Sequence, residues 1–498
     1  IGTSSLFETE VKQISNFINN DKDVPLLAGL LSGFYPLLFY YSNNFSAINS
    51  WEHIVYFSFF FLGIPLSIYG VLYYGFGLSK ILVKYRKHLL FVLLVVVTFA
   101  LLSQAMFLTV KKKILVVLFV VSVLVSIKLF KHYKKLIILL FIAMFLPLGK
   151  VLIHAYEHLK PMNWMQLPDD IEQVKLLHKP NIYLIQPDGY VNRQTLENAP
   201  YNSKSELYNW LEFSHFKVYK NFRSNYPASL ASNASLFGMK QHQFGDMLFP
   251  SLEIPNARDV ICGGNPALSI LKSNGYQAYF VVQDEYFQQN RKQTNYDYYN
   301  VDLAEIPFFS NDNNVKKEVL PDLKKAMQLQ NTEPKFFFVE KLMPHHIGFK
   351  ETSEKTVKER NRYFERIESV NDWIKETVSY IELNDENSII IILADHGGWV
   401  GLESYNDMYS TTDESLINST FSTLSAIKWN GFLKPDYDEN LKTNVNVFRV
   451  LFSVLSENKK YLNALEDDSS FNLHMNRSGS KSIKRIINNE GQILVNQK

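Results

Sequence analysis

Carboxylate and imidazole side chains of the kinds that bind divalent metals occur at three places in the second half of the chain. Asp188 lies in Pro-Asp-Gly, His345 and His346 follow Met-Pro, and Asp395 and His396 lie in Asp-His-Gly-Gly. Each group follows an apolar run. If the runs are parallel strands of one sheet, the groups meet at the carboxyl edge, where α/β proteins bind ligands. Mixed oxygen and nitrogen donors then indicate a divalent metal site.

A candidate nucleophile lies in the segment Ser-Asn-Tyr-Pro-Ala-Ser-Leu-Ala-Ser, residues 224–232. Pro227 and the small residues after it predict a loop that enters a helix. A hydroxyl at a helix start meets backbone N–H groups and the positive end of the helix dipole, where an anionic group is favoured. Ser229 has the best position. Coordination to a divalent cation would lower its pKa and supply a nucleophile without a separate strong base.

Each of these features also has a simpler interpretation on its own. Asp188 with the following glycine is a common turn pair. Ser229 could be a helix cap, and His345 and His346 could be surface imidazoles in a loop. Their joint occurrence at strand ends and at a helix start favours a functional site.

The elements that must position these residues are predicted from four continuous apolar runs, residues 181–186, 276–282, 335–340 and 388–394. Continuous rather than alternating apolar residues are typical of strands buried on both faces of a parallel sheet. A helix-like segment over residues 356–381 is expected to cover one face. Strands that alternate with helical segments predict an α/β fold.

The first third of the chain has a different composition. It contains apolar stretches at residues 24–42, 54–76, 89–110, 114–127 and 136–155. A helix needs about 20 mostly apolar residues to cross a membrane, and most of these stretches approach that length. The fourth is short and spans only if the flanking lysines extend outward. The stretches predict an α-helical membrane domain of about five spans.

Positive charge near the spans predicts the orientation. The loops after the second and fourth stretches are rich in lysine and arginine and are expected in the cytoplasm, with the N-terminus, whereas everything after Tyr156 lies outside. Three lysines, Lys111, Lys112 and Lys113, then lie on the outer side, against the rule that positive charge stays in the cytoplasm.

The expected parts of the chain are a cytoplasmic segment (1–23), a transmembrane domain (24–156), a juxtamembrane linker (157–179), a catalytic domain (180–455) and a polar, partly loose extension (456–498).

Composition excludes several classes of function. The net charge is +2, and the soluble part has no long basic or aromatic-basic tract, so nucleic acid is not an expected partner. The single cysteine, Cys262, permits neither an intrachain disulfide nor a zinc cluster built from cysteines. The five apolar stretches contain no Asp, Glu or Arg, which argues against a transporter.

The soluble part resembles the alkaline phosphatase superfamily, in the sulfatase-like branch that includes lipoteichoic acid synthases and phosphoethanolamine transferases. The resemblance covers about residues 180–452. It rests on the acidic residue after the opening strand, the serine-rich block at 224–232, His345, the Asp-His-Gly at 395–397 and the Asn-Val-Asn-Val-Phe-Arg at 444–449.

The resemblance implies that one divalent metal ion, Mn, Mg or Zn, is held by Asp188, Ser229, Asp395 and His396. It also implies that Ser229 attacks the substrate and that His345 contacts the phosphoryl oxygens. The family often has Thr in place of Ser229, a mild chemical change. It often reads Pro-His-Pro-Pro where this chain has Pro-His-His-Ile, so His346 could share the role of its neighbour. The Cys/Ser-x-Pro-x-Arg setting of a strict sulfatase does not occur around the lone cysteine or the candidate serine.

The expected architecture is an α-helical membrane domain followed by an α/β alkaline-phosphatase-like domain with a mainly parallel central sheet. The expected protein is a multi-pass enzyme of the bacterial inner (cytoplasmic) membrane with its catalytic domain on the periplasmic or extracellular side. It would move phosphoglycerol or phosphoethanolamine from a membrane phospholipid donor to a cell-envelope glycan or glycolipid acceptor through a covalent serine intermediate. Alternatives are a phosphodiesterase or phosphatase with water as acceptor, and a catalytically silent membrane scaffold that binds a glycan or a partner protein.

Overall fold

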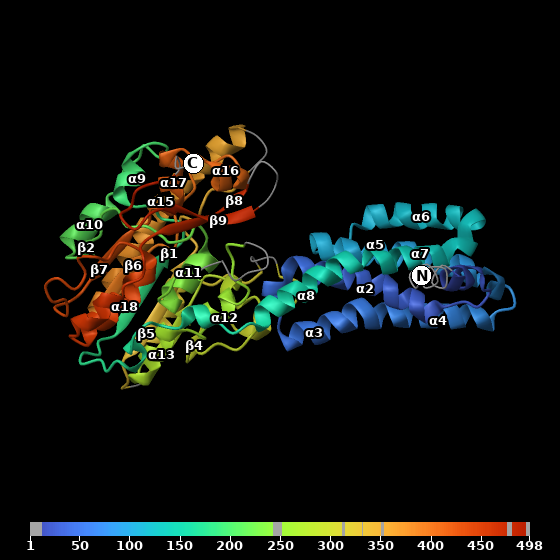
Figure 1. Cartoon of the computed structure of the whole chain (residues 1–498), viewed down its shortest axis with the longest axis horizontal. Helices are drawn as coiled ribbons and strands as arrows, with labels where there is room; N and C mark the ends of the chain where they lie inside the picture. Colours follow the sequence, from blue (N-terminus) through green and yellow to red (C-terminus); the bar gives the residue numbers. More distant parts are fainter. Residues whose placement is uncertain are drawn as a thin grey trace, which may run out of the picture. The chain divides into compact units, whose positions relative to one another are not determined.

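The computed structural model divides into two compact units (Figure 1). The first comprises Ile1–Leu159 with two short later segments, Gln289–Arg291 and Pro307–Asn311, and the second comprises the rest of the chain. The structure describes residues 12–242, 251–310, 314–330, 332–349, 353–475 and 481–494.

The first unit is helical. Its longer helices are α2 (Pro25–Asn44), α3 (Trp51–Ser58), α4 (Ile64–Leu78), α5 (Arg86–Phe107), α6 (Lys112–Leu129), α7 (Tyr133–Ala143) and α8 (Phe145–Leu159). A π-helical turn, Phe59–Gly63, joins α3 to α4 without breaking the helical run. Within the described residues, three helical runs are long and apolar enough to cross a membrane: Trp51–Leu78, Leu82–Phe107 and Lys112–Met165.

The predicted spans map onto these helices unevenly. The first forms α2, whose composition is less apolar than that of the three long runs. The fourth and fifth lie in the single run Lys112–Met165, where the 3-10 turn Phe130–His132 separates α6 from α7 at the lysine-rich loop. The number of membrane crossings therefore stays a prediction.

Polar contacts gather the predicted cytoplasmic segments at one end of the first unit. The Asp23 carboxylate accepts hydrogen bonds from the hydroxyls of Tyr73 (2.9 Å) and Tyr133 (3.2 Å). Lys87 forms an ion pair of 3.2 Å with Asp21. The segment before the first predicted span thus contacts residues near the loops that follow the second and the fourth predicted spans. A five-span chain requires this arrangement.

The second unit is built on a seven-stranded sheet of order β2-β7-β6-β1-β5-β3-β4. The strands are β1 (Ile182–Pro187), β2 (Lys217–Val218), β3 (Gln277–Val281), β4 (Tyr298–Tyr299), β5 (Lys335–Lys341), β6 (Ile389–Leu393) and β7 (Ser425–Lys428). The four predicted strands are the neighbours β6, β1, β5 and β3, all parallel, so the prediction of a mainly parallel core is confirmed. β7 and β2 extend the sheet as antiparallel neighbours.

Both faces of the sheet are buried, as the continuous apolar runs predicted. Ile182 and Leu184 of β1 belong to one core and Tyr183 and Ile185 to the other. Side chains of α11 (Ser229–Gly238), α12 (Ala257–Ile261), α13 (Pro266–Ser273) and α18 (Val447–Leu455) fill the first core. Side chains of α9 (Arg193–Glu197), α10 (Leu207–Phe213), α14 (Val319–Met327), α15 (Ser353–Asn384) and α16 (Tyr405–Ser410) fill the second. The long helix expected over residues 356–381 is confirmed as α15.

The C-terminal region is more ordered than its composition suggested. Residues after 456 form a 3-10 turn, Lys459–Ala464, and an antiparallel pair, β8 (Ser470–Met475) and β9 (Lys481–Ile487). The β8 backbone donates from Phe471 N to Asn225 O over 2.9 Å. The expectation of a loose extension was wrong for these described residues, because their polar groups bond the loop before α11. Residues 160–179 also belong to the second unit, so the boundaries expected for a separate linker remain predictions.

Candidate metal centre

The carboxyl ends of three neighbouring strands supply the candidate site. Asp188 follows β1, Asp395 follows β6, and His345 lies in the loop after β5. The turn after Asp188 needs glycine, since Gly189 has φ +71° and a Cβ there would lie 3.0 Å from the backbone of His345 and His346. The Asp-Gly pair is therefore a turn, as the simpler interpretation held, and the turn also packs the histidine loop against the candidate ligands.

Asp188, Asp395 and His396 form the one group of potential metal ligands found among the described residues, with donor atoms within 4.8 Å of one another. His396 Nε2 lies 3.4 Å from Asp188 Oδ1 and 3.5 Å from Asp395 Oδ2. All three side chains are buried. Neither of these two carboxylate oxygens has a hydrogen-bond partner among the described residues. Buried oxygens without partners are costly in a protein interior, and a cation between them would satisfy both.

The remaining polar atoms orient the donor atoms. His396 Nδ1 lies 2.8 Å from Gly397 O, a contact that assigns the proton to Nδ1 and leaves the Nε2 lone pair facing the carboxylates. Asp395 Oδ1 accepts hydrogen bonds from Gly189 N (3.2 Å) and from its neighbour's N–H, His396 N (3.0 Å). Two oxygens and one neutral imidazole nitrogen thus converge. The donor set fits a divalent cation. Three of the four residues predicted as ligands lie together here, and their role as ligands stays a prediction.

Ser229 is the first residue of α11, as the loop-to-helix pattern predicted. Its Oγ lies 3.2 Å from His396 Nε2. The helix cap is Ala228, so the Ser229 hydroxyl is not used for capping. The side chain is partly exposed although the three ligands are buried. The hydroxyl therefore lies between a buried ligand group and an accessible surface, the position that a nucleophile needs.

Two other residues of the predicted motifs hold the end of β6 in place. Ser232 Oγ, one helical turn after Ser229, donates to Asp395 O over 2.6 Å. Asn444 Nδ2 donates to Ala394 O over 3.2 Å and lies 3.2 Å from Ser232 Oγ. The serine-rich block thus supplies one hydroxyl to the site and another to the backbone that supports it.

His345 lies beside the ligands rather than among them. Its Nδ1 contacts Asp188 Oδ2 and its backbone N donates to Asp188 O over 2.8 Å. Burial alone would raise the pKa of Asp188, but the charge of His345 and its hydrogen bond hold the pKa of that carboxyl below its usual value. Burial likewise opposes the His345 cation, yet Asp188 outweighs burial and raises the pKa of the imidazole. The side chain is 45% exposed, so it offers a proton at the surface of the site.

His346 has a different environment from its neighbour. Its ring stacks on Trp399 with centroids 3.7 Å apart. Burial, followed by the charge of His345, lowers the pKa of His346 to about 3. We therefore expect a neutral, stacked His346 ring that does not share the role of His345.

Sequence reasoning missed two charged residues near the ligands. Arg366 on α15 has buried Nε and Nη2 atoms without a partner among the described residues, and its charge affects the pKa of His345. Burial lowers the pKa of Arg366. Glu340 on β5 is also buried, and burial together with the charges of nearby carboxylates raises its pKa well above the usual value. The local sequence around Arg366 is like that of the solvent-facing charged residues of α15, so nothing in it indicated a functional position. Glu340 could have been noticed, because it is a glutamate inside an apolar strand.

One family model matches the part of the chain that holds most of this site. The Sulfatase family model matches residues 217–426, which include Ser229, His345, Asp395 and His396; Asp188 precedes the matched range. None of the curated proteins compared matches the chain significantly.

Solved structures similar to this chain include proteins from three bacteria. The integral membrane protein lipooligosaccharide phosphoethanolamine transferase A (EptA) from Neisseria meningitidis has 12% identity and a TM-score of 0.42 over 86% of this chain and 95% of that chain. The zinc complex of the periplasmic domain of EptC from Escherichia coli has 11% identity and a TM-score of 0.42 over 64% and 96%. The lipoteichoic acid synthase LtaP from Listeria monocytogenes has 14% identity and a TM-score of 0.42 over 65% and 90%.

At these identities and TM-scores the likenesses decide nothing about substrate. The family model covers the candidate nucleophile, the histidine loop and the Asp-His-Gly segment. Residues 217–426 therefore match the Sulfatase family, in agreement with the sulfatase-like resemblance drawn from the motifs.

Proposed function

We propose that this protein is a membrane-anchored, metal-dependent transferase. It moves a phospho-substituent, phosphoglycerol or phosphoethanolamine, from a phospholipid donor to a cell-envelope glycan or glycolipid. The observation that carries the proposal is the position of Ser229 Oγ, 3.2 Å from His396 Nε2 at the edge of a buried group of three candidate ligands. The apolar helices of the first unit suit a donor that resides in a membrane.

In the proposed site, Asp188, Asp395 and His396 hold one divalent ion, and Ser229 lies within reach of it. When bound, the ion lowers the pKa of the Ser229 hydroxyl and offsets negative charge on the phosphoryl oxygens. Mn, Mg and Zn all remain candidates, since two carboxylates with one imidazole suit each of them.

The reaction has two half-reactions that balance. Deprotonated Ser229 Oγ attacks the phosphorus of the lipid phosphodiester; the Oγ–P bond forms, the P–O bond to diacylglycerol breaks, and His345 donates a proton to the leaving oxygen. An acceptor hydroxyl then attacks the same phosphorus, its proton passes to His345, and the Oγ–P bond breaks, which returns Ser229 to its deprotonated form. The raised pKa of His345 suits the first step, because an imidazolium is present to donate.

Arg366 supplies a second positive charge to this site in the proposal. Its Nε and Nη2 are buried without a partner, and it lies close enough to Asp188 and His345 for their charges to interact. Buried guanidinium nitrogens without a hydrogen-bond partner are costly for stability, and a substrate phosphoryl group is the kind of anion that relieves the cost.

A phosphodiesterase with water as the acceptor differs only in the second half-reaction. A silent scaffold is less well supported, since the ligand group and the nucleophile are all present and converge. The location follows from the same proposal: a multi-pass protein of the bacterial inner membrane whose second unit lies on the periplasmic or extracellular side.

The test is reconstitution of the full chain in vesicles that contain phosphatidylglycerol or phosphatidylethanolamine. The proposal expects metal-dependent release of diacylglycerol from one of the two lipids, with loss of release after chelation and in Ser229→Ala. Release that is unaffected by both treatments, or no release with Mn, Mg or Zn, would overturn the proposal.

A further inference from the structure

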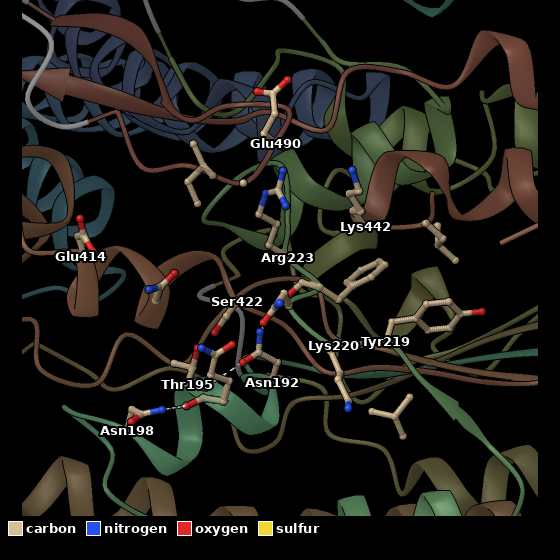
Figure 2. Close-up of a pocket in the computed structure, with 18 of the residues that line it drawn as sticks. Asn192, Thr195, Asn198, Tyr219, Lys220, Arg223, Glu414, Ser422, Lys442 and Glu490 are labelled. Atoms are coloured by element: carbon tan, nitrogen blue, oxygen red, sulfur yellow. Dashed lines mark hydrogen bonds between the residues drawn. The ribbon is translucent and has the colours of Figure 1, made fainter. Parts of the chain in front are cut away.

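A second concave region lies in the same unit as the metal centre (Figure 2). It is a cavity of about 950 Å³ bounded by the residues after β2, the residues before β7, the starts of α9 and of α17 (Glu414–Phe421), and the end of β9. None of the proposed catalytic residues lines it.

Sheet topology places this cavity at the same edge as the metal centre. β7 is antiparallel to β6, and β2 is antiparallel to β7, so β2 runs parallel to β6 and β1. The carboxyl end of β2 and the amino end of β7 therefore lie at the edge where Asp188 and Asp395 follow their strands. β2 and β1 are three steps apart in the sheet order, or about 14 Å at the usual strand spacing.

The lining of the cavity is polar and balanced in charge. Four basic residues face four acidic ones: Lys217, Lys220, Arg223 and Lys442 against Glu414, Asp438, Glu439 and Glu490. Amide and hydroxyl side chains fill much of the remaining lining: Asn192, Thr195, Asn198, Asn221, Asn418 and Ser422. A ligand with many hydroxyl groups, each both donor and acceptor, matches such a surface better than a strongly charged ligand does.

Two lining residues carry buried polar atoms without partners. Ser422 is 5% exposed and Arg223 is 8% exposed, yet Ser422 Oγ and Arg223 Nε have no hydrogen-bond partner among the described residues. The two residues are paired by an antiparallel bridge. Figure 2 shows both among the cavity's lining side chains, with Asn192 and Thr195 nearby.

The Arg223 guanidinium is held in place by the C-terminal region. Its Nη2 donates to Asp468 O over 2.6 Å and to Asn488 O over 3.1 Å. A fixed donor and an adjacent unpartnered hydroxyl, both nearly buried, form a preorganised polar floor. A ligand hydroxyl could accept from the guanidinium and bond the serine, and would remove the cost of leaving both atoms unpaired.

The geometry points to this cavity as a carbohydrate-binding subsite that receives a sugar of the acceptor glycan. The assignment rests on the proposed transferase function for the identity of the sugar as an acceptor. A short oligosaccharide with one sugar in the cavity can extend along the sheet edge and present a hydroxyl of another sugar near Ser229. In this assignment the C-terminal region has a function, because its backbone carbonyls hold the Arg223 guanidinium in place.

The test is ligand-observed saturation-transfer NMR on the full Ser229→Ala chain in detergent. The probes are an N-acetylglucosamine disaccharide, a glucose disaccharide, glycerol phosphate and inorganic phosphate. Asn418→Trp fills the cavity from an exposed lining position. Asn384→Trp is the matched control at an exposed position outside the lining. The expected result is binding of a disaccharide that Asn418→Trp weakens by about tenfold or more and that Asn384→Trp leaves unchanged.

Three outcomes would overturn the assignment: binding of neither disaccharide, binding of the phosphates alone, and disaccharide binding that survives Asn418→Trp.

A parallel assay separates the carbohydrate site from the proposed function. In chains that retain Ser229, Asn418→Trp should leave headgroup transfer to Ser229 unchanged and reduce onward transfer to the disaccharide. If wild-type protein forms no headgroup adduct but binds the disaccharide in the cavity, the proposed transferase fails and the carbohydrate site stands.

Discussion

Ser229 Oγ lies 3.2 Å from Nε2 of His396, and the other nitrogen of that ring lies 2.8 Å from Gly397 O. The Gly397 carbonyl can only accept, so Nδ1 carries a proton, and in the neutral ring the nitrogen near the serine carries a lone pair. This lone pair serves equally to bind a cation or to accept a proton from the hydroxyl. The two unpartnered oxygens of Asp188 and Asp395 beside it favour the cation.

Loss of a ligand should therefore remove the metal. We expect His396→Ala and Asp395→Ala to weaken divalent metal binding by more than the roughly 10–100-fold that loss of an outer hydrogen-bond partner costs. Metal content of the purified chain, measured by elemental mass spectrometry after dialysis against Mn, Mg or Zn, checks this. His178→Ala is the control, since His178 pairs with Glu457 away from the ligands. Equal metal content in all four proteins would contradict the assignment.

Replacement of His345 should affect turnover more than metal binding. As a general acid and base, His345 is expected to contribute about 10²–10⁴-fold to kcat, which His345→Gln would remove. His346→Phe keeps a ring stacked on Trp399 and should retain most activity. The measurement is diacylglycerol release by both variants, with metal content as a second readout. A larger loss in His346→Phe than in His345→Gln would reverse the roles assigned to the two histidines.

Arg366 offers a test in which activity and stability separate. A charge-assisted hydrogen bond to a phosphoryl oxygen is worth about 1.5–3 kcal/mol, so Arg366→Gln should lower kcat/KM by about 10–150-fold. The same change removes two buried nitrogen atoms that have no hydrogen-bond partner among the described residues, and we expect it not to lower the thermal unfolding temperature. Arg362→Gln, at a neighbouring position of α15 that pairs with Glu359, is the control. Destabilisation with unchanged kcat/KM would assign Arg366 a structural role instead.

His242 should make stability fall in acid. It is 1% exposed, its Nε2 lies 2.8 Å from Ala231 O of α11, and burial lowers its pKa to about 4. Because the folded pKa lies below the unfolded value of about 6.5, the stabilisation is complete above pH 6.5 and is lost as the pH falls towards 4, by up to about 3 kcal/mol. Thermal unfolding between pH 7 and about pH 4 checks this. His242→Asn should show a weaker pH dependence over that range, and an equal dependence would contradict the prediction.

The four central strands could be predicted from sequence because each is a continuous apolar run buried on both faces. β7 and β2 could not, since Ser425–Lys428 and Lys217–Val218 are short and partly polar and pair only because β6 has an open edge. The position of Asp188, His345 and Asp395 at one edge of the sheet followed from the parallel topology alone.

Features that depend on tertiary packing lay beyond the sequence. Arg366 has the same local pattern as the exposed arginines of α15, and only the fold shows that its Nε and Nη2 are buried and that its charge interacts with Asp188. The floor of the polar cavity depends on Arg223 meeting the carbonyls of Asp468 and Asn488, residues more than two hundred positions away along the chain. No local pattern predicts such a contact, and the polar, charged composition of the C-terminal region instead favoured a partly loose extension.

The central claim is that Ser229 forms a covalent bond to the transferred group. Intact-protein and peptide mass spectrometry of the full chain, after incubation with phospholipid and divalent metal, tests this most directly. The account predicts an adduct on Ser229 with the mass of phosphoglycerol or phosphoethanolamine, absent from Ser229→Ala and present in Ser235→Ala. Ser235 lies on the same helix, but its hydroxyl donates to Lys240 O, just after the helix ends. An adduct that persists in Ser229→Ala, or no adduct with any of these lipids and metals, would contradict it.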